Sequence, residues 1–352
     1  MAALKRPDRV HSIGLTITNS LLEHLSAIRR PFSKLEDLIL LSQDDVPLTL
    51  PSAFRWGQRL RRLHSTGIII PAFSQLRYPS MDLIDLQLHE VPDPWHFSAK
   101  ALPNALFRMA QLRSLSLHLL PVSDYVAISL LSQNRVILPA LTSLKYRGIT
   151  RDLEDLVARI DAPRLEDIEV IFSNESITNW SKLIGFIDRI KMHKSHRQVH
   201  ILSSETAFSI SLITPGVPTR LKFQSFCKPL SIQLSYMARI FIGLHTLFFY
   251  VEDLRINVTR QSRQEDTSHT GRWLKLLNLF GGVPALQGLY IPQPGPRHVP
   301  LREAVVSFMN LRRLSGHSIA VEYERPSHMS ELTGAGTKHA QCCRHCSLTR
   351  FQ

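Results

Sequence analysis

The residues with the greatest capacity for chemistry form a short cluster near the end of the chain. The stretch "CCRHC" holds Cys342, Cys343, His345 and Cys346, four side chains of the kinds that bind zinc. A structural zinc site usually draws its ligands from two separated pairs, whereas here two cysteines are adjacent and no second pair follows. Residues 321–352 are rich in Ser, Thr, Gly, Arg and His, so we expect a disordered tail without a metal.

A second cluster, "MHKSHRQVH", places His193, His196 and His200 among basic residues. It has the composition of a phosphate-binding or metal-binding patch. A solvated basic loop explains the same residues more simply, and we favour that interpretation.

Catalytic signatures are absent from the rest of the sequence. It contains no G-x-x-x-x-G-K-S/T, no G-x-G-x-x-G, no H-E-x-x-H and no G-x-S-x-G. We therefore predict a protein that is not an enzyme and that has no cofactor.

Charge is unevenly distributed over the 352 residues. Apolar residues make up 44 % and charged residues 20 %, as in ordinary folded proteins. Residues 1–172 carry 20 Lys/Arg and 18 Asp/Glu, a net charge of +2, whereas residues 173–352 carry 22 and 11, a net charge of +11. A basic half attracts acidic partners, so a nucleic-acid-binding protein is the alternative function, and an Arg-rich solvated surface is the simpler interpretation.

The expected compartment is intracellular, in the cytoplasm or the nucleus. Four cysteines are too few and too clustered for a disulfide framework. The first residues contain no apolar leader, and the longest apolar stretch, Ile240–Val251, is too short to span a bilayer. No membrane association is predicted.

A repeated phrase organises the chain. The unit Leu-x-x-Leu-x-Leu is typical of a strand, because its last two leucines are two residues apart and point to one face. The phrase begins at Val10, Leu35, Leu60, Leu83, Leu112, Leu141, Leu165, Leu244, Leu286 and Leu311.

Amphipathic helix patterns such as "TNSLLEHLSAI", "RDLEDLVARI" and "GRWLKLLNLF" lie between copies of the phrase. Strand and helix recurring every 23–29 residues are typical of a leucine-rich repeat. The expected fold class is α/β, a leucine-rich-repeat solenoid with a parallel concave sheet and outer helices. A doubly wound α/β domain also alternates strand and helix, but no Gly-rich loop follows any expected strand.

The expected solenoid covers residues 1–320. It is irregular at about 172–243, where "RQVHIL" and "TRLKFQSF" are candidate degenerate strands, and residues 321–352 form the tail.

Three stretches carry a resemblance to a known family. They are "TITNSLLEHLSAI", "LPSAFRWGQRLRRLHSTGIIIPAF" and "LPALTSLKYRGITRDLEDLVARIDAPRLEDIEVIF", and they resemble the repeat region of fungal F-box/leucine-rich-repeat proteins over about residues 1–315. The resemblance implies repeats that present a protein substrate to a cullin–RING ubiquitin ligase. In that family an F-box docks on the ligase adaptor. Because this sequence starts within the repeats and shows no F-box helices, we do not expect it to bind the adaptor.

The expected partner-binding residues flank the buried strand leucines and therefore face the concave side. Arginine and aromatic side chains among them are common binding anchors. They are Arg62, His64, Gln87, His89, His118, Lys145, Arg147, Asp167, Glu169, Phe248, Tyr250, Tyr290 and Arg313.

Overall fold

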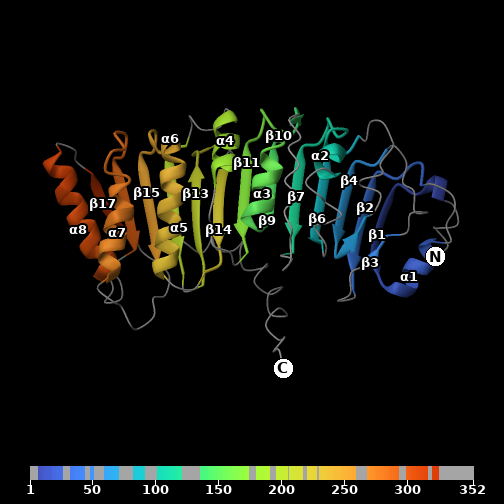
Figure 1. Ribbon diagram of the computed structural model, residues 1–352, viewed down its shortest axis with the longest axis horizontal. Coiled ribbons are helices and arrows are strands. Elements are labelled where there is room, and N and C mark those ends of the chain that lie inside the picture. The colour runs from blue at the N-terminus through green and yellow to red at the C-terminus, as the bar shows by residue number, and fades with distance from the viewer. Residues whose placement is uncertain are drawn as a thin grey trace, which may run out of the picture.

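In its described residues, the chain forms a mixed α/β structure built on one large sheet of 13 strands, most of them parallel (Figure 1). This computed structural model describes residues 7–26, 32–43, 48–50, 59–70, 82–91, 101–120, 135–173, 180–190, 196–204, 206–216, 220–227, 230–258, 268–292, 299–315 and 319–324.

The strands follow the chain from one end of the sheet to the other, apart from a block near the middle. In spatial order they are β1 (Ser12–Ile17), β2 (Asp37–Ser42), β4 (Arg62–Thr66), β6 (Asp85–Val91), β7 (Ser114–Leu119), β9 (Ser143–Gly148), β11 (Asp167–Phe172), β14 (Arg220–Ser225), β13 (Phe208–Ile213), β12 (Gln198–Ser203), β15 (Asp253–Val258), β16 (Gly288–Pro292) and β17 (Ala320–Glu324). Two short parallel pairs lie outside this sheet: β3 (Leu48–Thr49) with β5 (Ile68–Ile69), and β8 (Val136–Ile137) with β10 (Ile160–Asp161).

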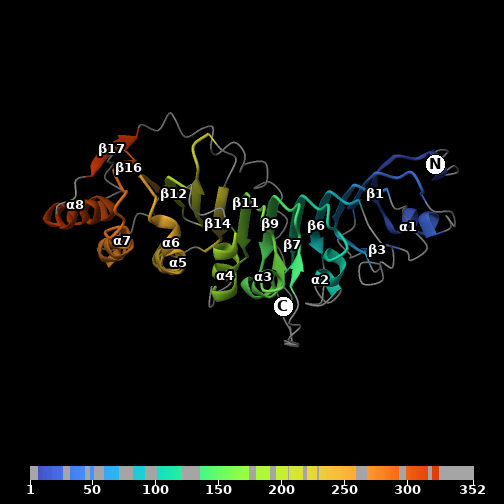
Figure 2. The same cartoon turned by 90° about the horizontal axis from the view of Figure 1, so that it is seen from above.

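The helices lie on one side of the row of strands (Figure 2). They are α1 (Asn19–Ser26), α2 (Ala101–Leu106), α3 (Thr150–Val157), α4 (Ser181–Arg189), α5 (Leu230–Gly243), α6 (His245–Phe248), α7 (Ser268–Asn278) and α8 (Val299–Leu314), with a 3-10 turn, η2 (Pro7–Arg9), before β1. We call the other side of the sheet the open face. None of the described helices is long and apolar enough to cross a membrane.

The repeated leucines stack in register and form the core between sheet and helices. Leu115, Leu144, Ile168 and Leu221 are hydrogen-bonded neighbours on β7, β9, β11 and β14, and each is 0 % exposed. Leu144 and Ile168, which fill the same place in consecutive copies of the phrase, are therefore equivalent buried positions. Because side chains alternate along a strand, the first, third and fifth residues of these strands point to the open face.

Some helices form side-chain hydrogen bonds with backbone groups at the ends of the helix before or after them. Glu154 of α3 is buried, and its carboxylate accepts hydrogen bonds from the backbone N–H groups of Lys182 (2.9 Å) and Leu183 (2.8 Å) at the start of α4. These groups have no partner within their own helix, so Glu154 caps it.

Arginines perform the corresponding task at the helix C-terminal ends. Arg189, in the last turn of α4, donates to the carbonyls of Val157 (3.2 Å), the last residue of α3, and Ile160 (3.4 Å), shortly after it. Arg312 of α8 donates in the same way to the carbonyls of Gly281 (2.7 Å) and Val283 (3.1 Å) after α7. Burial lowers the pKa of Arg312.

The block β12–β13–β14 is inserted in reverse order. β14 pairs with β11, β12 pairs with β15, and β13 lies antiparallel between them. The fully buried amide of Gln233 in α5 ties this block together. It donates to the carbonyls of Ser204 (2.8 Å) and Cys227 (2.7 Å), and it accepts a hydrogen bond from the hydroxyl of Ser203 (2.7 Å).

Eight of the ten expected strands are present, and two expectations are wrong. The phrase beginning at Leu244 starts directly after α5 and runs through α6, and the phrase beginning at Leu311 lies in α8. "RQVHIL" and "TRLKFQSF" are β12 and β14, whereas β13, β15 and β17 were not predicted. β17 runs past the expected boundary at 320, and the rest of the expected tail, with the "CCRHC" cluster, lies outside the described residues.

Candidate partner-binding face

Ten of the thirteen expected binding residues lie on the open face. They occupy the first, third or fifth position of their strands, in alternation with buried residues, and all are exposed or partly exposed. They are Arg62, His64, Gln87, His89, His118, Lys145, Arg147, Asp167, Glu169 and Tyr290.

The other three residues are elsewhere. Phe248 belongs to α6 and is only 4 % exposed, because it packs edge-on against Phe241 and Phe280 in the core. Tyr250 lies between α6 and β15 and is exposed, and Arg313 is an exposed residue of α8. Their placement on the open face was wrong because the phrases beginning at Leu244 and Leu311 are helical.

Charged side chains of neighbouring strands pair across the open face. Arg62 of β4 donates two hydrogen bonds to the carboxylate of Asp37 on β2, at 2.6 and 2.8 Å. Lys222 of β14 donates to Glu169 of β11 at 2.7 Å, and Lys145 of β9 stands beside Glu169 in the register. Burial alone would raise the pKa of Glu169. The hydrogen bond from Lys222 and its positive charge outweigh this effect and lower the pKa below its ordinary value, so the carboxylate is ionised at neutral pH.

Three histidines form a ladder across β4, β6 and β7. The ring centroids of His64 and His89 are 5.2 Å apart, and those of His89 and His118 are 6.4 Å apart. The imidazole of His89 also lies 2.9 Å from the hydroxyl of Ser116. Burial lowers the pKa of His64, so at neutral pH this ring is uncharged.

An apolar pair next to this ladder was not predicted. Ile39 and Leu41, at the third and fifth positions of β2, are 41 % and 37 % exposed. They stand beside His64 and Thr66 in the register. The sequence indicates this pair, because in "DLILLS" apolar residues also occupy the positions that alternate with the buried leucines. Apolar side chains beside polar ones are typical of the centre of a protein interface.

On β12, β15 and β16, the open face combines an arginine, an aromatic ring and a histidine. The guanidinium of Arg255 on β15 stacks over the ring of Tyr290 on β16, 4.7 Å from its centroid. His200 of β12 stands beside Arg255 in the register, and burial together with the charge of Arg255 lowers its pKa to about 4. His200 is therefore neutral at physiological pH.

Potential metal ligands lie on the open face and in the "MHKSHRQVH" cluster. Within the described ranges, no group of three or more His, Cys, Asp or Glu side chains is arranged to hold a metal ion, and this includes the histidine ladder. The "MHKSHRQVH" cluster does not form one patch in the described part. His196 is buried at the entry to β12, His200 lies on the open face, and His193 lies outside the described residues.

No protein-family model matches the chain. No curated protein matches it either.

Proposed function

We propose that the chain is a non-enzymatic recognition protein of the leucine-rich-repeat type, whose open face binds a protein partner. The observation that carries this proposal is the register of the open face. Strand after strand places side chains in aligned rows that no described helix covers, from Ile39 on β2 to Tyr290 on β16. Aligned rows on a rigid sheet present a fixed pattern of apolar, charged and aromatic groups to a partner.

The repeat architecture has support beyond the sequence pattern. Parallel strands recur with one register, the helices lie on one side, and the row of strands is bowed with the helices outside (Figure 2). Within this proposal, the resemblance to F-box/leucine-rich-repeat proteins makes the chain the substrate-binding part of a ubiquitin-ligase receptor.

The alternative, a nucleic-acid-binding protein, has less support from the open face. Two of its basic side chains are already paired with carboxylates on neighbouring strands, Lys222 with Glu169 and Arg62 with Asp37. A surface that tracks phosphates needs cations that are not already paired.

A capture experiment tests the proposal. The tagged full chain is incubated with cell extract, with and without nuclease, at two salt concentrations. The variant carrying Ile39→Asp and Lys145→Glu serves as the open-face control. A protein that survives nuclease and moderate salt, and that the variant fails to capture, supports the proposal. Binding that disappears with nuclease contradicts it, and capture of the ligase adaptor contradicts the expectation that the adaptor is not bound.

A further inference from the structure

Exposed apolar side chains gather at one edge of the molecule, separate from the open face. We call this edge, where the helices end and the strands begin, the strand-start edge. Of the seven large apolar side chains in the described residues that are more than half exposed, six lie there, and only Val306 does not. The six are Phe107 (71 %), Ile137 (63 %), Ile242 (61 %), Phe249 (51 %), Tyr250 (51 %) and Leu314 (86 %).

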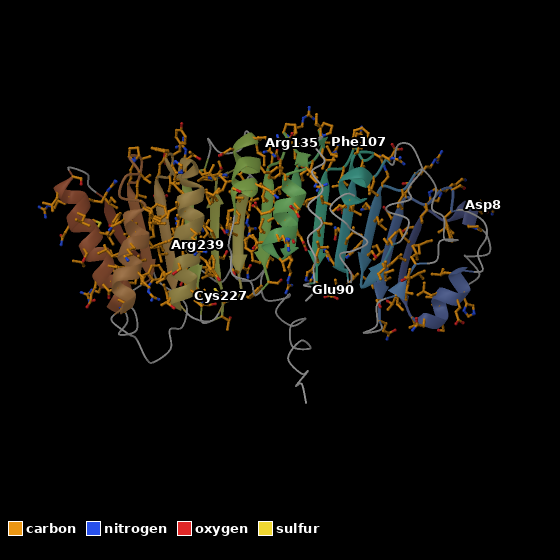
Figure 3. All side chains as sticks on the ribbon, in the orientation of Figure 1. Asp8, Glu90, Phe107, Arg135, Cys227 and Arg239 are labelled. Atoms are coloured by element: carbon orange, nitrogen blue, oxygen red, sulfur yellow. The ribbon has the colours of Figure 1, made fainter. Side chains whose placement is uncertain are left out.

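Arginines concentrate along the same edge in its middle part. The three segments that lead into β7, β9 and β11 are residues 106–113, 135–142 and 158–166, and together they contain five arginines and two carboxylates, a net charge of +3. The arginines are Arg108, Arg113, Arg135, Arg159 and Arg164. Figure 3 shows Phe107 and Arg135 at this edge, and Glu90 and Cys227 at the opposite one.

The local structure brings the apolar and basic groups together. β8 pairs with β10, which sets the segment of Arg135 and Ile137 beside that of Arg159 and Asp161. α2, which ends just before Phe107, packs against β8. Phe107 and Ile137 therefore lie within one small surface.

The carboxylates on this surface do not neutralise it. Asp161 accepts from Arg189 at 2.6 Å and lies 4.0 Å from Arg135. The guanidinium groups of Arg113 and Arg164 are exposed, and neither forms an ion pair or hydrogen bond within the described part of the chain. Exposed arginine beside exposed aromatic and aliphatic groups is the composition of a binding hot spot.

We propose that this part of the strand-start edge is a second interaction surface, which binds an acidic polypeptide segment carrying apolar side chains. Charge complementarity requires Asp or Glu in the partner, and Phe107 and Ile137 require an apolar group beside them. A polypeptide fits better than a nucleic acid, because its side chains can supply the apolar groups that cover Phe107 and Ile137, and because these segments offer one aromatic ring for stacking bases. The proposal is independent of the open face.

Selection from a phage-displayed library of random 12-residue peptides on the full chain tests this. Enriched peptides should be rich in Asp and Glu and contain aromatic or aliphatic residues. Fluorescence anisotropy with one enriched peptide should show binding at least tenfold weaker for the variant with Arg113→Glu and Arg164→Glu, and also for Phe107→Ser. Lys145→Glu on the open face and Arg272→Glu on α7 should change the affinity less than twofold. Circular dichroism and Tm establish that each variant is folded.

Two outcomes overturn the proposal. The first is enrichment of peptides without acidic residues, or acidic peptides that bind the edge variants as well as the wild type. The second is a 12-nucleotide oligothymidine that binds more tightly than the enriched peptide and depends on the same arginines, which would assign the edge to nucleic acid. Neither outcome bears on the open face, so the two proposals fail separately.

Discussion

Gln233 provides the sharpest test of how the reversed block β12–β13–β14 is held. Replacing it with Leu keeps most of the side-chain volume but leaves the hydroxyl of Ser203 and the carbonyls of Ser204 and Cys227 without their partner. A buried polar group without a hydrogen bond costs about 1–3 kcal/mol, and two of these three bonds lie at partly buried positions, so Gln233→Leu should cost about 2–4 kcal/mol.

Urea unfolding followed by circular dichroism measures this cost, provided that a single transition is observed. The matched control is Ser235→Ala in the same helix, where the hydroxyl bonds the Ser231 carbonyl at an exposed site; its cost should stay below about 0.5 kcal/mol. A double-mutant cycle with Ser203→Ala separates the polar contribution from packing. Ser203→Ala removes the hydroxyl that Gln233→Leu would leave without a hydrogen-bond partner. Gln233→Leu should therefore cost less in that background by roughly 1 kcal/mol. Equal costs in both backgrounds, or a Gln233→Leu variant as stable as the control, would refute the role given to this amide.

Three further predictions concern stability. Glu90 has a left-handed backbone (φ 53°) at the position equivalent to Gly67 (φ 69°) one repeat earlier, so Glu90→Gly should stabilise the protein by up to about 1 kcal/mol, whereas Gly67→Ala should destabilise it; thermal melts of both check the sign. Leu144→Ala and Ile168→Ala should each cost about 2–5 kcal/mol in urea unfolding, and Lys145→Ala on the open face little; similar costs for all three would place the strand register one residue out. His200 has a pKa of about 4 in the folded protein against an ordinary 6.5, so its contribution to stability is complete above pH 6.5 and is lost as the pH falls towards 4. That contribution is at most about 3 kcal/mol, and His200→Gln should flatten the pH dependence over this window; an unchanged slope would contradict the assignment.

The sequence was sufficient for the strands that keep the full phrase. Around Leu144 and Ile168, an apolar residue is followed three positions later by a pair of apolar residues that are two positions apart. This spacing defines both the strand and its buried face, because the period of a strand places the members of the pair on one face. The same logic placed ten candidate residues on the open face.

The errors have different causes. The spacing of Leu244 and Leu247 also fits one face of a helix, so the phrase alone does not decide between the two periods. In β12, which matched only as a degenerate strand, buried His196 fills the first position before Val199 and Ile201. In β15 the phrase is complete, since Val251 precedes Leu254 and Ile256 as Val10 precedes Ile13 and Leu15, so this strand was predictable from the sequence. The reversed order of β12, β13 and β14 depends on pairing between distant segments, which no local pattern specifies.

The most direct test of recognition through the open face is the affinity for the captured protein partner, measured for matched variants by isothermal titration calorimetry. Ile39→Asp combined with Lys145→Glu changes two open-face positions without touching the core, and Arg272→Glu makes one equivalent charge change on α7. Loss of a true anchor costs about 2 kcal/mol or more, so the open-face variant should raise Kd at least about 30-fold and Arg272→Glu less than twofold. An unchanged Kd for the open-face variant, with a loss of affinity for Arg272→Glu, would contradict the account.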